Sequence, residues 1–283
     1  MKVLNELFKY FFSFVLALAV LSLLICSILN SSVLKKEYFI SALEKTDYYQ
    51  KVYDLAYENF SIYVMQSGFE SSVFDGIISI NKVKEDTNNI FSSIYDNRDY
   101  PVDTDIIKAN LRDNINKHLQ DSGVKAEEKS LKKFENVIVE QYIYSVNYHT
   151  SVIKELANGL AKVRDIINSV DIAAKLALAV SLFMIILLNI KNIRVIINSI
   201  GVSALFIGVL SILFKSFINQ FFDFDVLLVI NKALTDLLEY ILNSLYIQLQ
   251  VYGIAFLLIG LCLILLGSYS QAKQGKKVSN NEK

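Results

Sequence analysis

The sequence is short of several residue types, and each shortage excludes a class of protein. Its 283 residues include one proline, no tryptophan and two cysteines. So little proline excludes collagen-like and proline-rich chains, and two cysteines are too few for a disulfide scaffold. Charged residues make up 20% and the formal net charge is zero, which disfavours a strongly basic nucleic-acid-binding protein. Hydrophobic residues make up 53%, so the composition indicates an integral membrane protein.

Four long apolar runs predict four transmembrane helices. They cover residues 11–30, 172–190, 195–214 and 251–269, and none has a charged residue near its middle. About 20 apolar residues are needed to cross the roughly 30 Å hydrocarbon core of a bilayer. The first run lacks a site of small residues suitable for cleavage, so we interpret it as a retained anchor and not as a signal peptide.

The lysine and arginine residues that flank these runs predict the orientation of the chain. They lie in residues 1–10, in the short turn 191–194 and in the tail 270–283. By the positive-inside rule, these three segments face the cytoplasm. Residues 31–171 and 215–250 then face outward, and we expect a multi-pass protein of the plasma membrane with both termini in the cytoplasm.

Residues 31–171 predict a large extracytoplasmic domain that contains only helices. Gly68 is a typical helix end, and Pro101 lies in a polar turn that stops a helix. Three helices are therefore expected before the last one, over residues 36–66, 71–95 and about 103–119. The domain holds 17 basic and 22 acidic residues, a balance of −5, which favours proteins, cations or neutral molecules over polyanions as partners.

The last helix of this domain carries the clearest pattern in the sequence. From Val139 to Ala174, apolar residues recur at alternating steps of three and four, as they do in a coiled-coil seam. Because no proline interrupts the pattern, we expect one continuous helix over 127–190. It would pack against the first helix as an antiparallel stalk or bundle, so the predicted fold class is an all-α integral membrane protein with four transmembrane helices and this domain between the first two.

The segment before the fourth run predicts an amphipathic helix. Residues 226–248 place leucines and an isoleucine on one face and charged side chains on the other. This pattern suits a helix that lies on the outer leaflet or packs beneath the outer domain.

Two candidate sites lie in the outer domain. His149 occupies a seam position, where it is either a packed ring with one hydrated nitrogen or a pH-sensitive switch. Tyr49, Tyr53 and Tyr57 form a stripe at i, i+4 spacing, which indicates either helix packing or a contact surface for a partner.

Gly253, Gly260 and Gly267 recur every seven residues on one face of the fourth run. They are typical of helix packing, or of a face for a partner subunit, because a neighbouring backbone can come close to glycine. Cys26 and Cys262 lie at different depths in their runs, and we interpret both as small buried hydrophobic side chains. With both cysteines in the membrane, a zinc site is not expected, and no cofactor-binding motif is present.

The predicted cytoplasmic segments are too short for a catalytic or signalling domain, so the function is expected outside or within the bilayer. Our leading hypothesis is a non-enzymatic protein whose outer domain binds another membrane or exported protein in an envelope or export assembly, with an oligomer possible and nucleic acid excluded. One alternative is a sensor or regulator that signals to a separate partner. The other is a permease-like subunit of a transporter.

Two resemblances belong to these alternatives. The order of one span, a large outer domain and three spans is similar to permease subunits of the cell-division and macrolide-exporter type, which implies coupling to an ATPase. The helical stalk resembles sensor domains of the chemoreceptor type, which implies signalling along the long helix. The high use of lysine, asparagine and isoleucine suggests a bacterial source.

Overall fold

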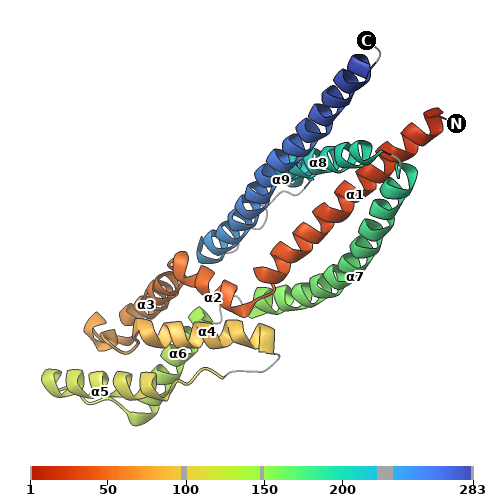
Figure 1. Cartoon of the computed structure of the whole chain (residues 1–283). Helices are drawn as coiled ribbons and strands as arrows, with labels where there is room; N and C mark the ends of the chain where they lie inside the picture. Colours follow the sequence, from red (N-terminus) through yellow and green to blue (C-terminus); the bar gives the residue numbers. More distant parts are fainter. Residues whose placement is uncertain (1, 97–100, 147–149, 191, 222–231, 282–283) are drawn as a thin grey trace. The chain divides into compact units, whose positions relative to one another are not determined.

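The computed structural model of the chain describes residues 2–96, 101–146, 150–190, 192–221 and 232–281 (Figure 1). All secondary structure in these ranges is helical, as nine α-helices and one 3-10 helix. The prediction of an all-α protein is therefore confirmed for the part of the chain that the structure describes. The chain divides into two compact units. The membrane unit comprises Met1–Leu34, Lys162–Val229 and Ile241–Lys283, and the helical domain comprises Lys35–Ala161 and Ile230–Tyr240.

The membrane unit is built from four long helices. They are α1 (Lys2–Ser31), α7 (Thr150–Leu188), α8 (Ile193–Phe221) and α9 (Lys232–Asn281), of which α7 and α9 contribute residues to both units. Each contains an apolar segment long enough to cross a bilayer. These segments are Glu6–Ser31, Asn158–Leu188, Ile193–Ser216 and Lys232–Ser268. The structure thus confirms the prediction of four helices that could span a membrane.

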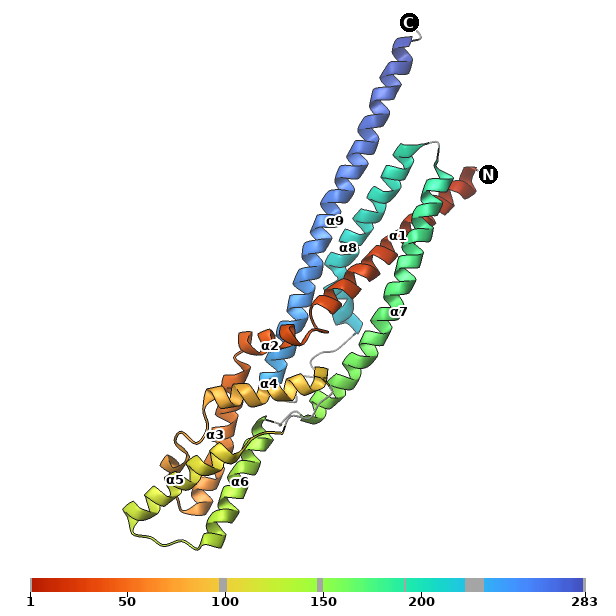
Figure 2. The same cartoon turned by 60° about the horizontal axis from the view of Figure 1, so that its bottom comes forward.

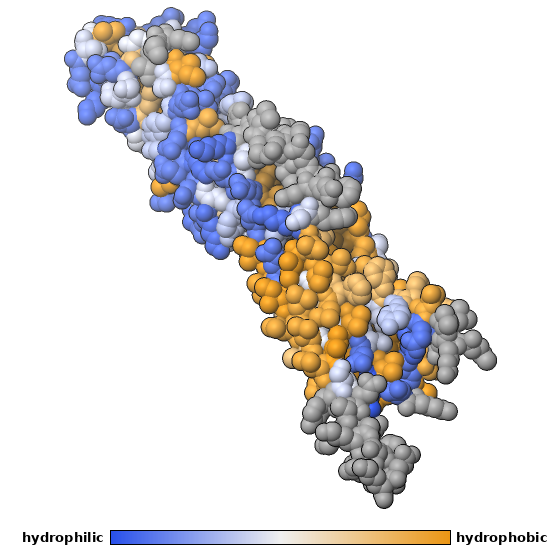
Figure 3. Space-filling view, turned by 90° about the horizontal axis from the view of Figure 1, so that it is seen from above, coloured by the Kyte–Doolittle hydropathy of each residue, from blue (hydrophilic) through white to orange (hydrophobic). Residues whose placement is uncertain are grey.

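The outward sides of these helices carry large apolar side chains. Leu176, Phe183, Leu258 and Leu265 are each at least 60% exposed. In Figure 3 the hydrophobic colour gathers over the helices of the membrane unit. Apolar surface on this scale is typical of contact with lipid or with another protein.

Helix α1 packs against α8 through small polar and aliphatic residues. The buried Ser203 hydroxyl donates to the Ser13 carbonyl oxygen on α1 at 2.7 Å and to the Ser199 carbonyl oxygen at 2.9 Å. Beside this contact, Leu16 and Ile196 are buried together. Because the Ser203 hydroxyl finds backbone acceptors, α1 and α8 approach closely here without leaving this donor unpaired.

The helix predicted over 226–248 is not a separate element. Residues 226–231 lie outside the described ranges, and from Lys232 onward the chain is part of α9, which continues to Asn281. No glycine or proline occurs between Lys232 and Tyr252 to end the helix. The charged face is accommodated within the helical domain, where Lys51 Nζ lies 2.5 Å from Asp236 Oδ2.

The helical domain has its own core, formed by several shorter helices. They are α2 (Lys36–Lys45), α3 (Tyr48–Ser67), the 3-10 helix η1 (Ser71–Phe74), α4 (Ile80–Asp96), α5 (Asp105–Ser122) and α6 (Glu128–Val146). Helix α3 packs against α4 and α6, and α5 packs against α6 and η1. The largest fully buried side chains include Phe60, Phe91, Ile115, Ile138 and Tyr142.

The first helix predicted for this domain, over 36–66, is wrong as a single element. It breaks between α2 and α3, where Asp47 adopts a left-handed conformation with φ 51°. The Thr46 hydroxyl donates to the Ala42 carbonyl oxygen at 2.9 Å. Short polar side chains such as Thr46 can hydrogen-bond to nearby backbone groups, and Asp tolerates the left-handed conformation better than most residues. Both properties permit a turn inside an otherwise helical pattern. The predicted end at Gly68 is correct, since its φ is 76°.

The second predicted helix, over 71–95, is also divided. Residues 71–74 form η1, a turn follows at Gly76 with φ 71°, and α4 begins at Ile80. The side-chain amide of Asn114 on α5 donates to the Val73 and Asp75 carbonyl oxygens at 3.0 and 2.8 Å. These bonds to backbone acceptors stabilise the turn, and they come from a residue distant in sequence.

The long helix predicted over 127–190 is described as α6 and α7, and residues 147–149 between them lie outside the described ranges. Within α6 the predicted seam is buried at Val139, Tyr142 and Val146. Within α7 the seam is buried only in part, since Ile167 and Ala174 are buried whereas Val163 and Val170 are each 38% exposed. The alternating pattern therefore describes a buried stripe in α6 and an interrupted one in the described part of α7.

A buried polar network ties α6 to α4. The Tyr142 hydroxyl donates to Asp86 Oδ2 at 2.5 Å, and Lys82 Nζ donates to Asp86 Oδ1 at 2.9 Å. Asp86 is 2% exposed and Tyr142 is fully buried. Burial and the hydrogen bond to Asp86 raise the pKa of the Tyr142 hydroxyl well above its ordinary value, so it stays protonated and continues to donate.

We expect the variant Tyr142→Phe to lower the free energy of unfolding by about 1–3 kcal/mol, because the buried Asp86 carboxylate loses a donor. Urea titration of the detergent-solubilised chain, followed by circular dichroism, measures the change. Tyr63→Phe, at a half-buried tyrosine of α3, is the control and should change stability by less than about 0.5 kcal/mol. Equal midpoints for the two variants would contradict the assignment.

Candidate functional site

The tyrosine stripe of α3 lies within the helical domain. Tyr49 is 7% exposed, and its hydroxyl donates to Asn88 Oδ1 on α4 at 2.6 Å. Burial raises the pKa of this hydroxyl to about 12. The rings of Tyr53 and Tyr57 are half-buried with centroids 4.8 Å apart. The stripe is therefore engaged in packing within the domain, while His149 lies outside the described residues.

The glycines of α9 face α8, and Figure 2 shows these helices side by side. A methyl group added at Gly253 would lie 2.8 Å from Ser211 Cβ, and one added at Gly260 would lie 2.8 Å from the Gly201 carbonyl oxygen. A methyl group at Gly267 would overlap the side chain of Asn198. All three glycines are thus at places where α8 comes too close for a larger residue.

The cysteines differ from each other. Cys26 is buried, with its thiol 3.8 Å from the Ile167 carbonyl oxygen. Cys262 is exposed on α9, so the prediction that its side chain is buried inside the protein is wrong. Its surroundings on α9 are apolar, since Leu261 and Leu265 beside it are also exposed.

A polar groove of about 580 Å³ lies on the helical domain, between η1 and the second half of α5. It is lined by three carboxylates, one lysine, one histidine, two serines, an asparagine and a valine. These residues are Glu70, Ser72, Val73, Asp75, Asn114, Lys117, His118, Asp121 and Ser122. The excess of carboxylates makes the groove suitable for a ligand with positive charge.

Two features position the walls of this groove. The Asn114 amide, described above, ties the 73–75 turn to α5. On the opposite side of α5, Arg112 donates to both oxygens of Glu135 on α6 and to Glu128, where Nη1 and Oε1 are 2.8 Å apart. These bonds hold the pKa of Arg112 above its ordinary value and lower the pKa of Glu128. The two-pronged pairing fixes the rotation of α5 against α6.

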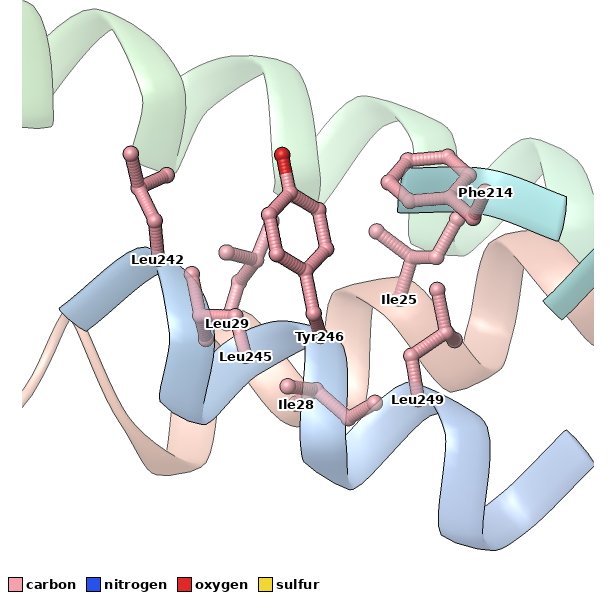
Figure 4. Close-up of a pocket in the computed structure, with 8 residues that line it drawn as sticks. All are labelled: Ile25, Ile28, Leu29, Phe214, Leu242, Leu245, Tyr246 and Leu249. Atoms are coloured by element: carbon pink, nitrogen blue, oxygen red, sulfur yellow. The ribbon is translucent and has the colours of Figure 1, made fainter. Parts of the chain in front are cut away.

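An apolar pocket of about 180 Å³ lies in the membrane unit, where parts of α1, α8 and α9 converge (Figure 4). Seven of its eight lining side chains are aliphatic or phenyl, and the eighth is Tyr246. In Figure 4 the Tyr246 ring stands between the aliphatic side chains, and its hydroxyl points away from α9. The lining residues are Ile25, Ile28, Leu29, Phe214, Leu242, Leu245, Tyr246 and Leu249.

One cation lies beside this pocket. Lys215 follows Phe214 on α8, and its Nζ lies 5.5 Å from the centroid of the Tyr246 ring. The same Nζ donates to Asn243 Oδ1 at 3.2 Å. The pocket therefore combines an apolar interior with one positive charge next to its aromatic wall.

The sequence predicted neither the polar groove nor the apolar pocket. Each is formed by residues from separate helices, and no single stretch of sequence carries their pattern. The one available signal for the apolar pocket was Lys215, a lysine placed directly after the third apolar run. Among the described residues, no group of three or more His, Cys, Asp or Glu side chains could hold a metal ion.

We compared the chain with known protein families, with curated proteins and with solved structures, and none of the three comparisons found a match.

We expect Gly260→Ile to destabilise the membrane unit by about 1–3 kcal/mol, because the added side chain must displace the backbone of α8. Thermal unfolding of the detergent-solubilised chain, followed by size-exclusion chromatography, measures this. Cys262→Ile places the same side chain on the exposed side of the same helix and serves as the matched control. If the control loses as much stability as the glycine variant, close packing at Gly260 is not the cause.

Proposed function

We propose that this chain is a non-enzymatic multi-pass membrane protein whose helical domain binds another protein in an envelope or export assembly. In this proposal residues 31–171 lie outside the cytoplasm, and the groove between η1 and α5 is the binding site. The partner presents a segment with lysine or arginine side chains. The acid-rich groove is the observation on which the proposal depends.

The charge of the groove supports this choice of partner. Glu70, Asp75 and Asp121 line it against a single lysine, Lys117. Opposed charges across an interface steer association and select partners more than they add affinity. Because Arg112 and Asn114 hold both walls, the groove is formed before a partner arrives, which reduces the entropic cost of binding.

The polar groups of the membrane unit support a role for the helical domain over a role in transport. Among the described residues, the buried polar side chains of the membrane unit are serines and one asparagine, with no buried acid, lysine or arginine. Ion-coupled transporters generally place ionisable residues inside the bilayer. The buried carboxylates among the described residues, Asp86 and Glu135, belong to the helical domain instead.

Site-specific photo-crosslinking in intact cells of the source organism tests the proposal. A photoreactive phenylalanine analogue replaces Ser122 at the groove or, as a control, Ile62, which is 53% exposed and does not line the groove. We expect one discrete protein adduct from position 122 and none of that mass from position 62. Asp121→Lys should reduce the adduct at least about fivefold through charge repulsion, whereas Asp113→Lys, an exposed acid of α5 outside the groove, should not.

A labelling experiment tests the side of the membrane. In a chain with Cys26 and Cys262 replaced by alanine, an impermeant thiol reagent should label Ser122→Cys in intact cells and Lys276→Cys only after lysis. Labelling in the opposite order, or equal adducts from positions 62 and 122, would contradict the proposal. An ATPase or a kinase in the adduct would favour the transporter or the sensor instead.

A further inference from the structure

The apolar pocket of the membrane unit has the properties of a site for a hydrocarbon chain. Cavities of about 150 Å³ that are lined by aliphatic and phenyl side chains exclude water and bind small apolar molecules. This pocket holds about 180 Å³, and among the described residues that line it Tyr246 is the one with a polar side chain. An α-helix, about 10 Å across, is too wide for such a space, whereas a single extended chain fits it.

The surroundings of the pocket identify the source of that chain. Its lining residues all lie within the segments Glu6–Ser31, Ile193–Ser216 and Lys232–Ser268, which are apolar enough to cross a bilayer. In a membrane, the chains available to these segments are the acyl chains of lipids. Lipid is therefore the molecule that reaches the pocket at the highest concentration.

The ammonium group of Lys215 gives the site a preference for lipids with a negatively charged headgroup. Lys215 directly follows the apolar run 195–214, whose length of about 20 residues matches the thickness of the hydrocarbon core, so in a bilayer this lysine is expected where the headgroups begin. Within the described part of the chain, no carboxylate lies within 4.0 Å of Lys215 Nζ, whose partners there are the Asn243 amide oxygen and the face of Tyr246. A half-buried ammonium group with neutral partners can donate a further hydrogen bond to a phosphate oxygen.

We propose that this pocket binds one acyl chain of an anionic phospholipid and that Lys215 binds the phosphate of its headgroup. Tyr246 joins the two parts of the site, because its ring lines the pocket and contacts Lys215. Asn243 orients the lysine, because Lys215 Nζ donates a hydrogen bond to Asn243 Oδ1 at 3.2 Å. Neither the pocket nor this lysine takes part in the protein binding proposed above, so the two proposals stand independently.

Native mass spectrometry of the delipidated full chain in detergent tests the site. Phosphatidylglycerol and phosphatidylcholine with identical acyl chains are added separately, and the bound fraction gives an apparent Kd for each. We expect the chain to bind phosphatidylglycerol more tightly than phosphatidylcholine. Lys215→Gln should raise the apparent Kd for phosphatidylglycerol about tenfold and leave the apparent Kd for phosphatidylcholine unchanged. Lys215→Arg keeps the charge and should keep the preference.

Two controls separate this site from general attraction to anionic lipid. Lys175→Gln removes a cation of α7 that is 66% exposed and already paired with Asp171 at 2.5 Å, so it should not change the preference. Leu245→Trp fills the pocket and should weaken binding of both lipids while circular dichroism stays unchanged. Equal losses for the two glutamine variants, equal affinity of the native chain for both lipids, or displacement of phosphatidylglycerol by equimolar oleate would overturn the proposal.

Discussion

The close approach of α8 and α9 is the constraint on which the membrane unit depends. Gly201 and Gly208 on α8 face Gly260 and Gly253 on α9, and a methyl group added at any of the four would come within 2.9 Å of a neighbouring atom. Lipid tails are as apolar as leucine, so helices in a bilayer gain little from hydrophobic burial. Backbones that touch directly gain dispersion energy instead, and this contact fixes the axial position of one helix against the other.

That fixed position explains why a charge and an apolar pocket occur together. The glycine contacts pair residue 201 with residue 260 and residue 208 with residue 253, so the helices run antiparallel and Lys215 falls beside Asn243 and Tyr246. A slip of one residue would rotate each side chain by about 100° and separate these groups. The register that makes the helices pack is therefore the register that builds the pocket.

The sequence was most informative where a pattern is local. Apolar runs predicted four helices, and Gly68 marked a helix end, because length and left-handed backbone are properties of one segment. It failed where a distant residue decides the outcome. The breaks at Asp47 and Gly76 lie inside helical patterns, and the second of them is held by Asn114 from α5. The polar groove has no local signal, and the pocket has only that of Lys215 after the third apolar run, since each cavity needs side chains from separate helices.

The buried polar groups of the two units differ in where their hydrogen-bond partners come from. In the membrane unit, Ser181 and Asn189 bond to carbonyl oxygens of their own helix, at 2.7 and 2.9 Å, so they need no partner from elsewhere. In the helical domain, Asp86 and Glu135 are buried against donors that include Tyr142 and Arg112 on other helices. A buried charge is tolerated only when several donors surround it, and lipid supplies none. Among the described residues, the buried charged networks therefore lie in the helical domain, where the Arg112 pairing holds α5, one wall of the acid-rich groove.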